Sequence, residues 1–339
     1  MQDVRQCSIN LNYWWIVAHL KSFPRNGIKP AKVGSLELVV VKQRNGKFSV
    51  FEDACPHKRV RLSEFGRRDG NKLVCSYHGW KFAANGQCTD VPGMETVTKQ
   101  FCLKSYPVRE YGGWLWVFLG EAQLVDSVPL PKIYPSQSPH YHPIPMQGEI
   151  GCHFSYITEN ATDLFHADLH QSAQPWANPK LLWLNSDSHT VTAIYEVDTP
   201  RLLAALISHP GKNRVHVMYE YPYFHLWSED GAFYLFVVYV PTAPQRTWVY
   251  STFYFRHVWG IPWILKLLHP ILDKGTFRQV FAEDIKAVQE EQRAYNLHSQ
   301  DLSRETNPVS HAVRKVILNQ TQGRSPLTPE PFVYQGKPL

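Results

Sequence analysis

The stretch CPHKRVRLSEFGRRDGNKLVCSYHGW, from Cys55 to Trp80, carries the pattern that decides the fold of the first part of the chain. It holds a Cys-x-His pair and, after a gap of 17 residues, a Cys-x2-His pair. Thiolates and imidazoles are common ligands of zinc and of iron. Two short loops that each carry one cysteine and one histidine therefore predict a metal site.

The order of the ligands separates two kinds of site. Zinc can be held by two Cys and two His, but zinc fingers usually place both Cys in one loop and both His in the other. Here each loop carries a mixed pair, so each can give its thiolate to one iron and its imidazole to a second. That is the ligand set of a Rieske [2Fe–2S] cluster. We predict such a cluster on Cys55, His57, Cys75 and His78, with zinc as the alternative.

The residues around these ligands strengthen the interpretation. The stretch resembles the Rieske motif of the non-heme iron oxygenases, with Pro56 in the first loop and Tyr77, Gly79 and Trp80 in and after the second. The resemblance implies an α+β protein. An N-terminal all-β Rieske domain would precede a catalytic domain of the helix-grip (START-like) kind, in which helices pack on an antiparallel sheet.

Turn-forming residues and prolines along the chain suggest where these domains begin and end. Short strand patterns with Asn-Gly turns at Asn45-Gly46 and Asn85-Gly86 fill the first third, and prolines then gather in a polar stretch. Helical patterns over residues 158–171 and 276–297 flank long strand patterns, one pair of which is joined at Asp230-Gly231. We expect a Rieske domain over 1–120, a Pro-rich linker over 121–146, a catalytic domain over 147–310 and a loosely attached tail over 311–339.

Composition limits the class of protein. The chain has 339 residues, 44% of them hydrophobic, which fits a globular protein with one or two cores. The longest apolar segment, Trp259–Leu272, is broken by prolines and a lysine, and is shorter than the roughly 20 residues that span a bilayer. The N-terminus lacks a signal-peptide pattern, and six cysteines do not make a disulfide scaffold. We expect a cytoplasmic protein without a transmembrane segment.

Charge gathers around the first metal motif. Seven basic residues and two acidic ones lie between Lys58 and Lys81, against a net charge of +6 for the whole chain. This face could be merely solvated, and no nucleic-acid motif accompanies it. The other interpretation is a docking surface for an acidic redox partner, steered by long-range attraction. Its candidate residues are Lys58, Arg59, Arg67 and Arg68.

A second candidate site lies in ENATDLFHADLHQ, residues 159–171. On a continuous helix Asp163, His166 and His170 would fall within about 60° of one another, while Asp168 would point away. Two histidines four residues apart can grip one metal ion, although two exposed histidines are the plainer interpretation. In the family that the chain resembles, such an Asp-x2-His-x3-4-His pattern supplies two ligands of a mononuclear Fe(II). That pattern here also includes Asn160.

The resemblance implies a third ligand, a carboxylate on a late helix, which completes a 2-His-1-carboxylate triad. In residues 276–297 the helical period places Asp284 on the apolar face, aimed at the core, and places Glu283 off that face. A buried carboxylate needs a cation or a proton. Asp284 is therefore the predicted ligand, and Glu291, two turns further on, is its rival.

Asp163 has an implied role of its own. In the family, an aspartate at this position links a cluster ligand of one subunit to an iron ligand of its neighbour, within a ring that is usually a homotrimer. We therefore expect Asp163 and Asn160 to belong to the catalytic machinery rather than to the ligand set.

The function implied by the resemblance is that of a terminal oxygenase. Electrons from NAD(P)H would arrive through a separate ferredoxin and/or flavin reductase, since no GxGxxG fingerprint is visible in the chain. With O₂ as cosubstrate, the enzyme would hydroxylate or oxidatively demethylate an organic small molecule. Three alternatives remain: a ring-dihydroxylating dioxygenase, a Rieske electron carrier with an inactive second domain, and a zinc-stabilised binding module.

Overall fold

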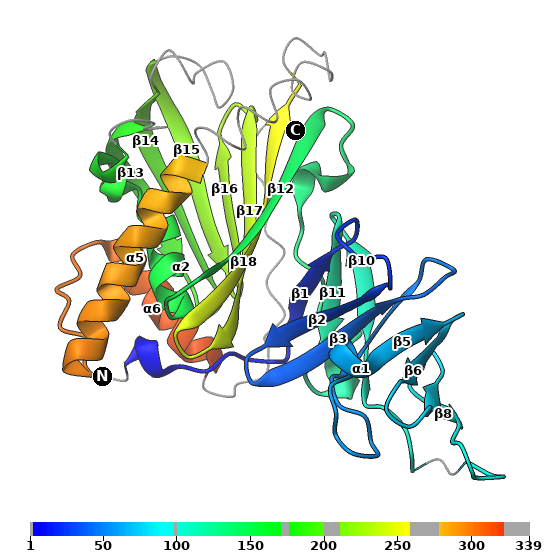
Figure 1. Cartoon of the computed structure of the whole chain (residues 1–339). Coiled ribbons are helices and arrows are strands. Elements are labelled where there is room, and N and C mark those ends of the chain that lie inside the picture. The colour runs from blue at the N-terminus through cyan, green and yellow to red at the C-terminus, as the bar shows by residue number, and fades with distance from the viewer. Residues whose placement is uncertain (1–2, 98–99, 171–175, 200–210, 258–277, 322–339) are drawn as a thin grey trace. The chain divides into compact units, whose positions relative to one another are not determined.

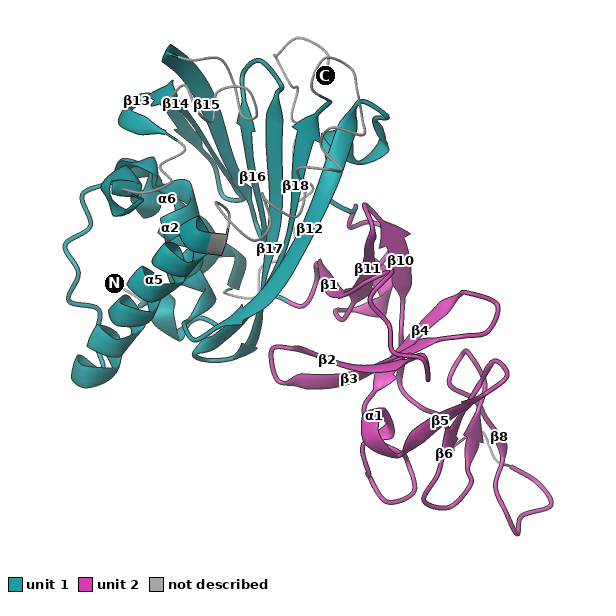
Figure 2. Ribbon diagram, turned by 45° about the horizontal axis from the view of Figure 1, so that its top comes forward, with its two compact units in different colours: residues 1–10, 130–339 teal, residues 11–129 magenta. Residues whose placement is uncertain are grey.

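The computed structural model describes residues 3–97, 100–170, 176–199, 211–257 and 278–321. The chain divides into two compact units, which Figure 2 shows in different colours. Unit 2 is residues 11–129, and unit 1 combines residues 1–10 with residues 130–339.

The described strands of unit 2 form three antiparallel sheets, with the orders β1-β11-β10, β2-β3-β4-β9 and β5-β6-β7-β8. The short helices of this unit are α1 (Leu62–Phe65) and η2 (Ala122–Leu124). The strands are β1 (Trp14–His19), β2 (Ile28–Val33), β3 (Leu36–Lys42), β4 (Phe48–Glu52), β5 (Gly66–Asp69), β6 (Lys72–Cys75), β7 (Lys81–Phe82), β8 (Cys88–Asp90), β9 (Ser105–Tyr106), β10 (Val108–Tyr111) and β11 (Trp114–Phe118).

Both predicted Asn-Gly turns are confirmed. Gly46 joins β3 to β4 and Gly86 joins β7 to β8, each with φ of 86°. Glycine adopts this left-handed conformation without the steric penalty of a side chain. The hairpins bring the two Cys-His loops to a common core, in which Phe51, Leu62 and Phe82 pack around the two cysteines.

The described strands of unit 1 form one antiparallel sheet of order β12-β18-β17-β16-β15-β14-β13. Helices cover one face of this sheet (Figure 1), which confirms the predicted α+β class. The strands are β12 (Tyr141–Ile150), β13 (Ala177–Ser186), β14 (Thr190–Thr199), β15 (Gly211–Glu220), β16 (Tyr223–Ser228), β17 (Phe233–Ala243) and β18 (Arg246–Arg256). The helices are η1 (Val4–Gln6), η3 (Tyr134–Gln137), α2 (Phe154–Thr162), η4 (Leu164–Leu169), α5 (Arg278–His298) and α6 (Pro308–Thr321).

Contacts across the layers identify the helix-facing side of the sheet. The hydroxyl of Tyr195 on β14 donates to the backbone oxygen of Thr162 at the end of α2, 3.2 Å away. The ring of Phe253 on β18 packs against Phe281 on α5 with centroids 5.7 Å apart. Because side chains alternate along a strand, these contacts fix which residues of each strand face the helices.

The units begin and end at other residues than the predicted domains. Residues 1–10 belong to unit 1, because Val4 and Arg5 are buried there beside α2. Unit 2 continues to residue 129, and the indole N–H of Trp14 donates to the backbone oxygen of Val128 at 2.9 Å.

The structure also differs from the predicted linker over residues 121–146 and the predicted tail over residues 311–339. Strand β12 begins inside the predicted linker, and its Pro143 and Pro145 are tolerated because β12 is an edge strand of the sheet. Helix α6 covers residues 308–321 and buries Val313 and Ile317, so this part of the predicted tail is packed rather than loose.

None of the described helices is long and apolar enough to cross a bilayer. The apolar segment Trp259–Leu272, for which the sequence predicts no bilayer span, lies outside the described residues.

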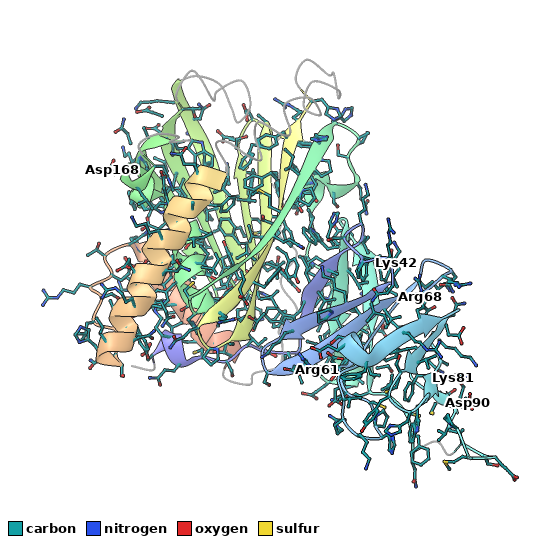
Figure 3. The ribbon with its side chains drawn as sticks, in the orientation of Figure 1. Lys42, Arg61, Arg68, Lys81, Asp90 and Asp168 are labelled. Atoms are coloured by element: carbon teal, nitrogen blue, oxygen red, sulfur yellow. The ribbon has the colours of Figure 1, made fainter. Side chains whose placement is uncertain are left out.

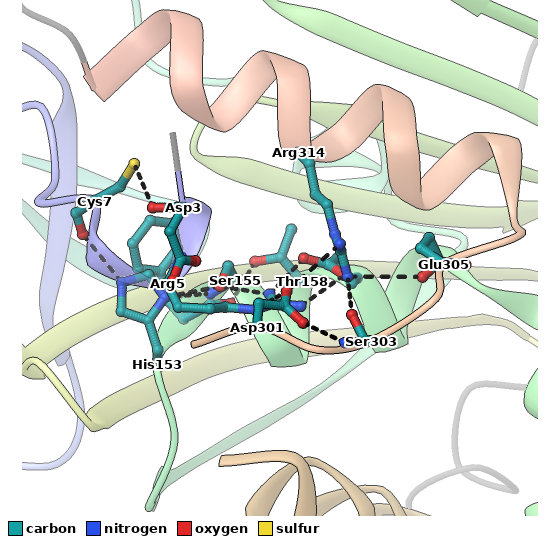
Figure 4. A network of polar contacts seen from close by, with 12 residues as sticks. Asp3, Arg5, Cys7, His153, Ser155, Thr158, Asp301, Ser303, Glu305 and Arg314 are labelled. Carbon is teal, nitrogen blue, oxygen red and sulfur yellow. Dashed lines mark hydrogen bonds and ion pairs between the residues drawn. The ribbon is translucent and has the colours of Figure 1, made fainter. Parts of the chain in front are cut away.

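A buried network of ion pairs joins η1, Asp301 and α6 to α2 (Figure 4). The guanidinium of Arg5 donates to both carboxylate oxygens of Glu159, at 2.5 and 3.0 Å, and to the hydroxyl of Ser155 at 2.7 Å. Arg314 on α6 reaches the same carboxylate at 2.7 Å, and Asp301 lies 3.4 Å from Arg5. The Arg5 side chain is only 1% exposed, so its charge depends on these partners.

Candidate metal sites

The two Cys-His loops of unit 2 have the same backbone geometry. The carbonyl of Cys55 accepts from the N–H of Arg59, and the carbonyl of Cys75 accepts from the N–H of Gly79, both at 2.8 Å. The N–H of each cysteine donates to the carbonyl five residues on, at 2.9 Å. Arg59 and Gly79 both have positive φ, 56° and 74°. Each loop thus turns back on its cysteine and projects its histidine beyond it.

The four predicted ligands separate into a buried pair and an exposed pair. Cys55 and Cys75 are buried, whereas His57 and His78 are exposed with ring centroids 4.4 Å apart. Tetrahedral zinc would require all four ligand atoms within about 4 Å of one another. Among the described residues these four do not form such a single-ion group. Two thiols inside and two imidazoles outside suit a dinuclear cluster, with one pair on each iron.

The thiol pair also needs a positive group. Burial, together with the neighbouring Cys75, raises the pKa of Cys55 to about 11. Such a thiol becomes a thiolate only when a cation binds it, which is the state that iron–sulfur ligation requires. The His57 ring stacks on Trp80 at 5.1 Å with the planes 3° apart, so the exposed imidazole still has a fixed orientation.

The second site is built differently from the prediction. A continuous helix over residues 158–171 is wrong: α2 ends at Thr162, and a 3₁₀ helix, η4, covers 164–169. The break is at Asp163, which is extended and whose carboxylate accepts from the N–H of Phe165 at 2.8 Å. An aspartate that caps a new helix in this way ends the preceding one.

The structure nevertheless brings His166, His170 and Asp284 together. Their ligand atoms all lie within 4.8 Å of one another. The Oδ1 atom of Asp284 is 3.4 Å from Nε2 of His166 and 3.3 Å from Nε2 of His170. Two imidazoles and one carboxylate are the donor set of a 2-His-1-carboxylate facial triad. Such a triad binds one side of a metal ion and leaves the other coordination positions open.

Electrostatics in this group favour a bound cation. Burial would raise the pKa of Asp284, but the hydrogen bonds and charges of His166 and His170 outweigh it and hold that pKa below its usual range. The carboxylate therefore stays ionised inside the protein. Asn160 on α2 donates to the same Oδ1 from 3.3 Å, which orients Asp284.

Sequence reasoning missed one residue of this site. Glu283, which the helical period places off the apolar face, accepts from Nδ1 of His170 at 2.9 Å. The only signal in the sequence is that Glu283 directly precedes Asp284. A glutamate side chain is long enough to reach a neighbour of the apolar face from a position beside that face. Glu291, the rival of Asp284, is exposed and does not belong to the group of ligand atoms.

Asp163 and Asp168 take different places. Asp163 is half-buried, and burial raises its pKa, against the Phe165 N–H and the His166 charge, which lower it. Nδ1 of His166 is buried and has no hydrogen-bond partner among the described residues. Asp168 is exposed on η4 (Figure 3).

The predicted docking residues are not equally accessible. Lys58, Arg59 and Arg67 are exposed, and Arg59 pairs with Glu52. Arg68 is half-buried and donates to the backbone oxygen of Lys42 at 2.7 Å, so that it ties two strands together (Figure 3).

Comparison with known proteins agrees with this description. Residues 13–107 match the family model of the Rieske [2Fe-2S] domain. The chain is 28% identical to a 4beta-methylsterol monooxygenase of Methylococcus capsulatus, over 94% of this chain and 90% of that protein. It is 32% identical to the phthalate 4,5-dioxygenase oxygenase subunit of Pseudomonas putida, over 42% of this chain and 33% of that one.

The fold has a counterpart among solved structures. A structure of dicamba monooxygenase bound to dicamba superposes with a TM-score of 0.78 at 17% identity, covering 92% of this chain and 97% of that chain. The Rieske match falls on the unit that holds the two Cys-His loops, so this unit contains a Rieske [2Fe-2S] domain, and the chain as a whole is similar to the Rieske non-heme iron oxygenases.

Proposed function

We propose that the chain is the terminal oxygenase of a multicomponent system, and that it hydroxylates or oxidatively demethylates an organic small molecule. The convergence of His166, His170 and Asp284 carries this proposal, because a pure electron carrier has no use for a second buried metal site. When bound, the cluster would relay single electrons and Fe(II) would activate O₂ beside the substrate.

The residues would divide this work between the two units. Cys55, Cys75, His57 and His78 would hold the [2Fe–2S] cluster, with the imidazoles at the surface where electrons enter and leave. In unit 1, His166, His170 and Asp284 would hold Fe(II). Asn160 would keep Oδ1 of Asp284 directed at the metal.

The name of the Methylococcus relative supports oxidation of a methyl-bearing, largely apolar substrate. Aromatic side chains on the helix-facing side of the sheet, among them Phe253 beside Phe281, fit such a substrate class. Ring dihydroxylation is the second candidate, because the phthalate relative is named a dioxygenase.

Metal content and turnover test the proposal together. The purified protein, reconstituted anaerobically, is expected to hold about three irons per chain, two in the cluster and one in the second site. With a generic ferredoxin and reductase fed by NAD(P)H, isotopically labelled O₂ is expected to enter a substrate or its released fragment. Two irons and no turnover would indicate the electron carrier, and a colourless zinc protein would indicate the binding module.

The reductase or ferredoxin would dock on the basic face of unit 2. Reversing Lys58 and Arg67 to Glu is expected to raise the KM for the partner about tenfold at low salt, and the effect should shrink in 0.5 M salt because ions screen exposed charges. Both side chains are exposed, so little stability should be lost. Steady-state kinetics against partner concentration measures the effect.

The matched control reverses Arg44 and Lys47, which are exposed at the β3–β4 turn of the same unit. This pair changes the net charge by the same amount at another place. An equal loss in the control would mean that overall charge, and not this surface, attracts the partner.

We also propose a homotrimer in which Asp163 couples the second site to the cluster of a neighbouring copy. The orphaned Nδ1 of His166 and the exposed Phe165 and Leu169 next to Asp163 support a surface that another copy covers. On the other unit, Phe65 and Tyr77 are exposed near His78. Analytical ultracentrifugation tests the assembly: a monomer at working concentration contradicts it.

Asp163→Asn isolates the charge of this residue. Asparagine caps a helix about as well as aspartate, so η4 should remain and both metals should stay bound. Reduction of the second site is expected to slow by about tenfold or more, since the negative charge beside His166 is lost. Single-turnover kinetics of the prereduced enzyme measures this, and an unchanged rate removes Asp163 from the electron path.

A further inference from the structure

The imidazole of His170 lies between two consecutive carboxylates of α5. Its Nε2 is 3.3 Å from Oδ1 of Asp284, and its Nδ1 is 2.9 Å from Oε2 of Glu283. The ring is 5% exposed and the Glu283 side chain 27%, so this contact is shielded from water on the His170 side. Helix α5 thus places one carboxylate beside each ring nitrogen of His170.

This geometry decides where the ring proton lies. An ionised carboxylate only accepts hydrogen bonds, so Nδ1 of His170 must carry the proton that bonds to Glu283. Nε2 faces the carboxylate of Asp284 in the same way, so its proton has to leave when a metal ion binds there. The proton on Nδ1 stays with Glu283 and leaves the lone pair of Nε2, an atom of the converging ligand group, to the metal. Glu283 therefore selects the tautomer in which His170 can bind a metal ion.

The two histidines differ in this respect. Nδ1 of His166 is buried and lacks a hydrogen-bond partner among the described residues, whereas Nδ1 of His170 has a carboxylate. A carboxylate on the far nitrogen of a ligating histidine fixes the ring and raises its basicity. Glu283 also adds a second negative charge near Asp284, on the far side of the His170 ring, and this charge suits a divalent cation at the site.

We propose that Glu283 is a positioning residue that holds His170 in its ligating tautomer and sets the affinity of the second site for Fe(II). Glu283 is not itself a ligand, because its carboxylate points to the far nitrogen. The inference rests on the proposed iron site at His166, His170 and Asp284. It extends that site to a residue which acts through His170.

Metal binding can be measured without turnover. After the second site is stripped with a chelator and the cluster is left intact, anaerobic calorimetry with Fe(II) reports the affinity of the site. Glu283→Ala is expected to weaken binding by about 10- to 100-fold. Glu283→Gln should lose less, because the amide oxygen can still accept from Nδ1 although the charge is gone. The visible spectrum of the cluster should not change in either variant.

Glu290→Ala is the matched control. Glu290 lies two turns further along α5, is exposed and pairs with Arg293, so its loss should leave Fe(II) affinity unchanged. The order alanine, glutamine, wild type in rising affinity supports the positioning role, since a purely structural loss would also lower the melting temperature of the stripped protein. Wild-type affinity in both variants overturns the role of Glu283. A wild-type protein that binds no Fe(II) at this site would instead contradict the proposed function.

Discussion

His166→Ala is expected to abolish product formation while the visible spectrum of the cluster stays unchanged. The substitution removes one of two imidazoles whose Nε2 atoms face Asp284, so the second site should lose its iron. The cluster ligands lie in the other unit and keep their buried core. We expect a loss of about a thousandfold or more in turnover, equivalent to about 4 kcal/mol of barrier. Iron analysis beside a turnover assay measures both effects.

His298→Ala supplies the control for this experiment. His298 is exposed at the end of α5, outside the ligand group, so iron content and turnover should match the wild type. If His166→Ala retained about three irons per chain and its turnover, the second site would have to lie elsewhere.

Arg5→Ala is expected to be the most destabilising change of a single charged residue outside the metal sites. It removes the cation that bonds Glu159 and Ser155, lies 3.4 Å from Asp301, and stacks 3.7 Å above the ring of Tyr156. Breaking a buried ion pair leaves a charge without compensation. Because Arg314 still reaches Glu159, we expect the low end of the usual range, about 3 kcal/mol. For a unit of this size that lowers the melting temperature by about 6 to 12 °C.

Arg293→Ala is the comparison. Arg293 pairs with Glu290 at 2.7 Å on an exposed face of α5, and such surface pairs contribute less than about 1 kcal/mol. Thermal unfolding followed by far-UV circular dichroism should therefore separate the two variants clearly. Equal melting temperatures would show that the network around Glu159 does not hold α2 in place.

Local sequence predicted the Rieske domain, which the family match confirms, for a physical reason. Cys55 and His57, like Cys75 and His78, are close neighbours in the chain, so their loops are determined by a few hydrogen bonds within each segment. The hairpin turns at Gly46 and Gly86 are local in the same sense. The α+β class followed from strand patterns that tertiary packing left intact.

The convergence of His166, His170 and Asp284 was predicted partly for the wrong reason. The angular argument assumed one helix through Asp163, His166 and His170, and the capping side chain of Asp163 breaks it. The three predicted ligand positions still converge, because η4 turns His166 and His170 toward α5. Asp284 followed from helical period because α5 is regular around it.

Contacts between distant segments could not be read from the sequence. Glu283 meets His170 across 113 residues, and Arg5 meets Glu159 across 154. The aromatic strand residues show the same limit, because alternation puts Phe253 on the helix-facing side but Phe236 on the opposite one. The alternation of side chains shows that a strand has two faces, but only the elements packed against the sheet determine which face lies under the helices.

The discontinuity of unit 1 has a consequence for how the protein is made. Residues 11–129 leave the ribosome as one block and can fold as soon as they emerge, as domains generally do. Residues 1–10 cannot complete their unit at that time, because Asp301 and Arg314 are translated much later than Arg5. The buried ion pairs around Arg5 and Glu159 can therefore close only after α6 has been translated.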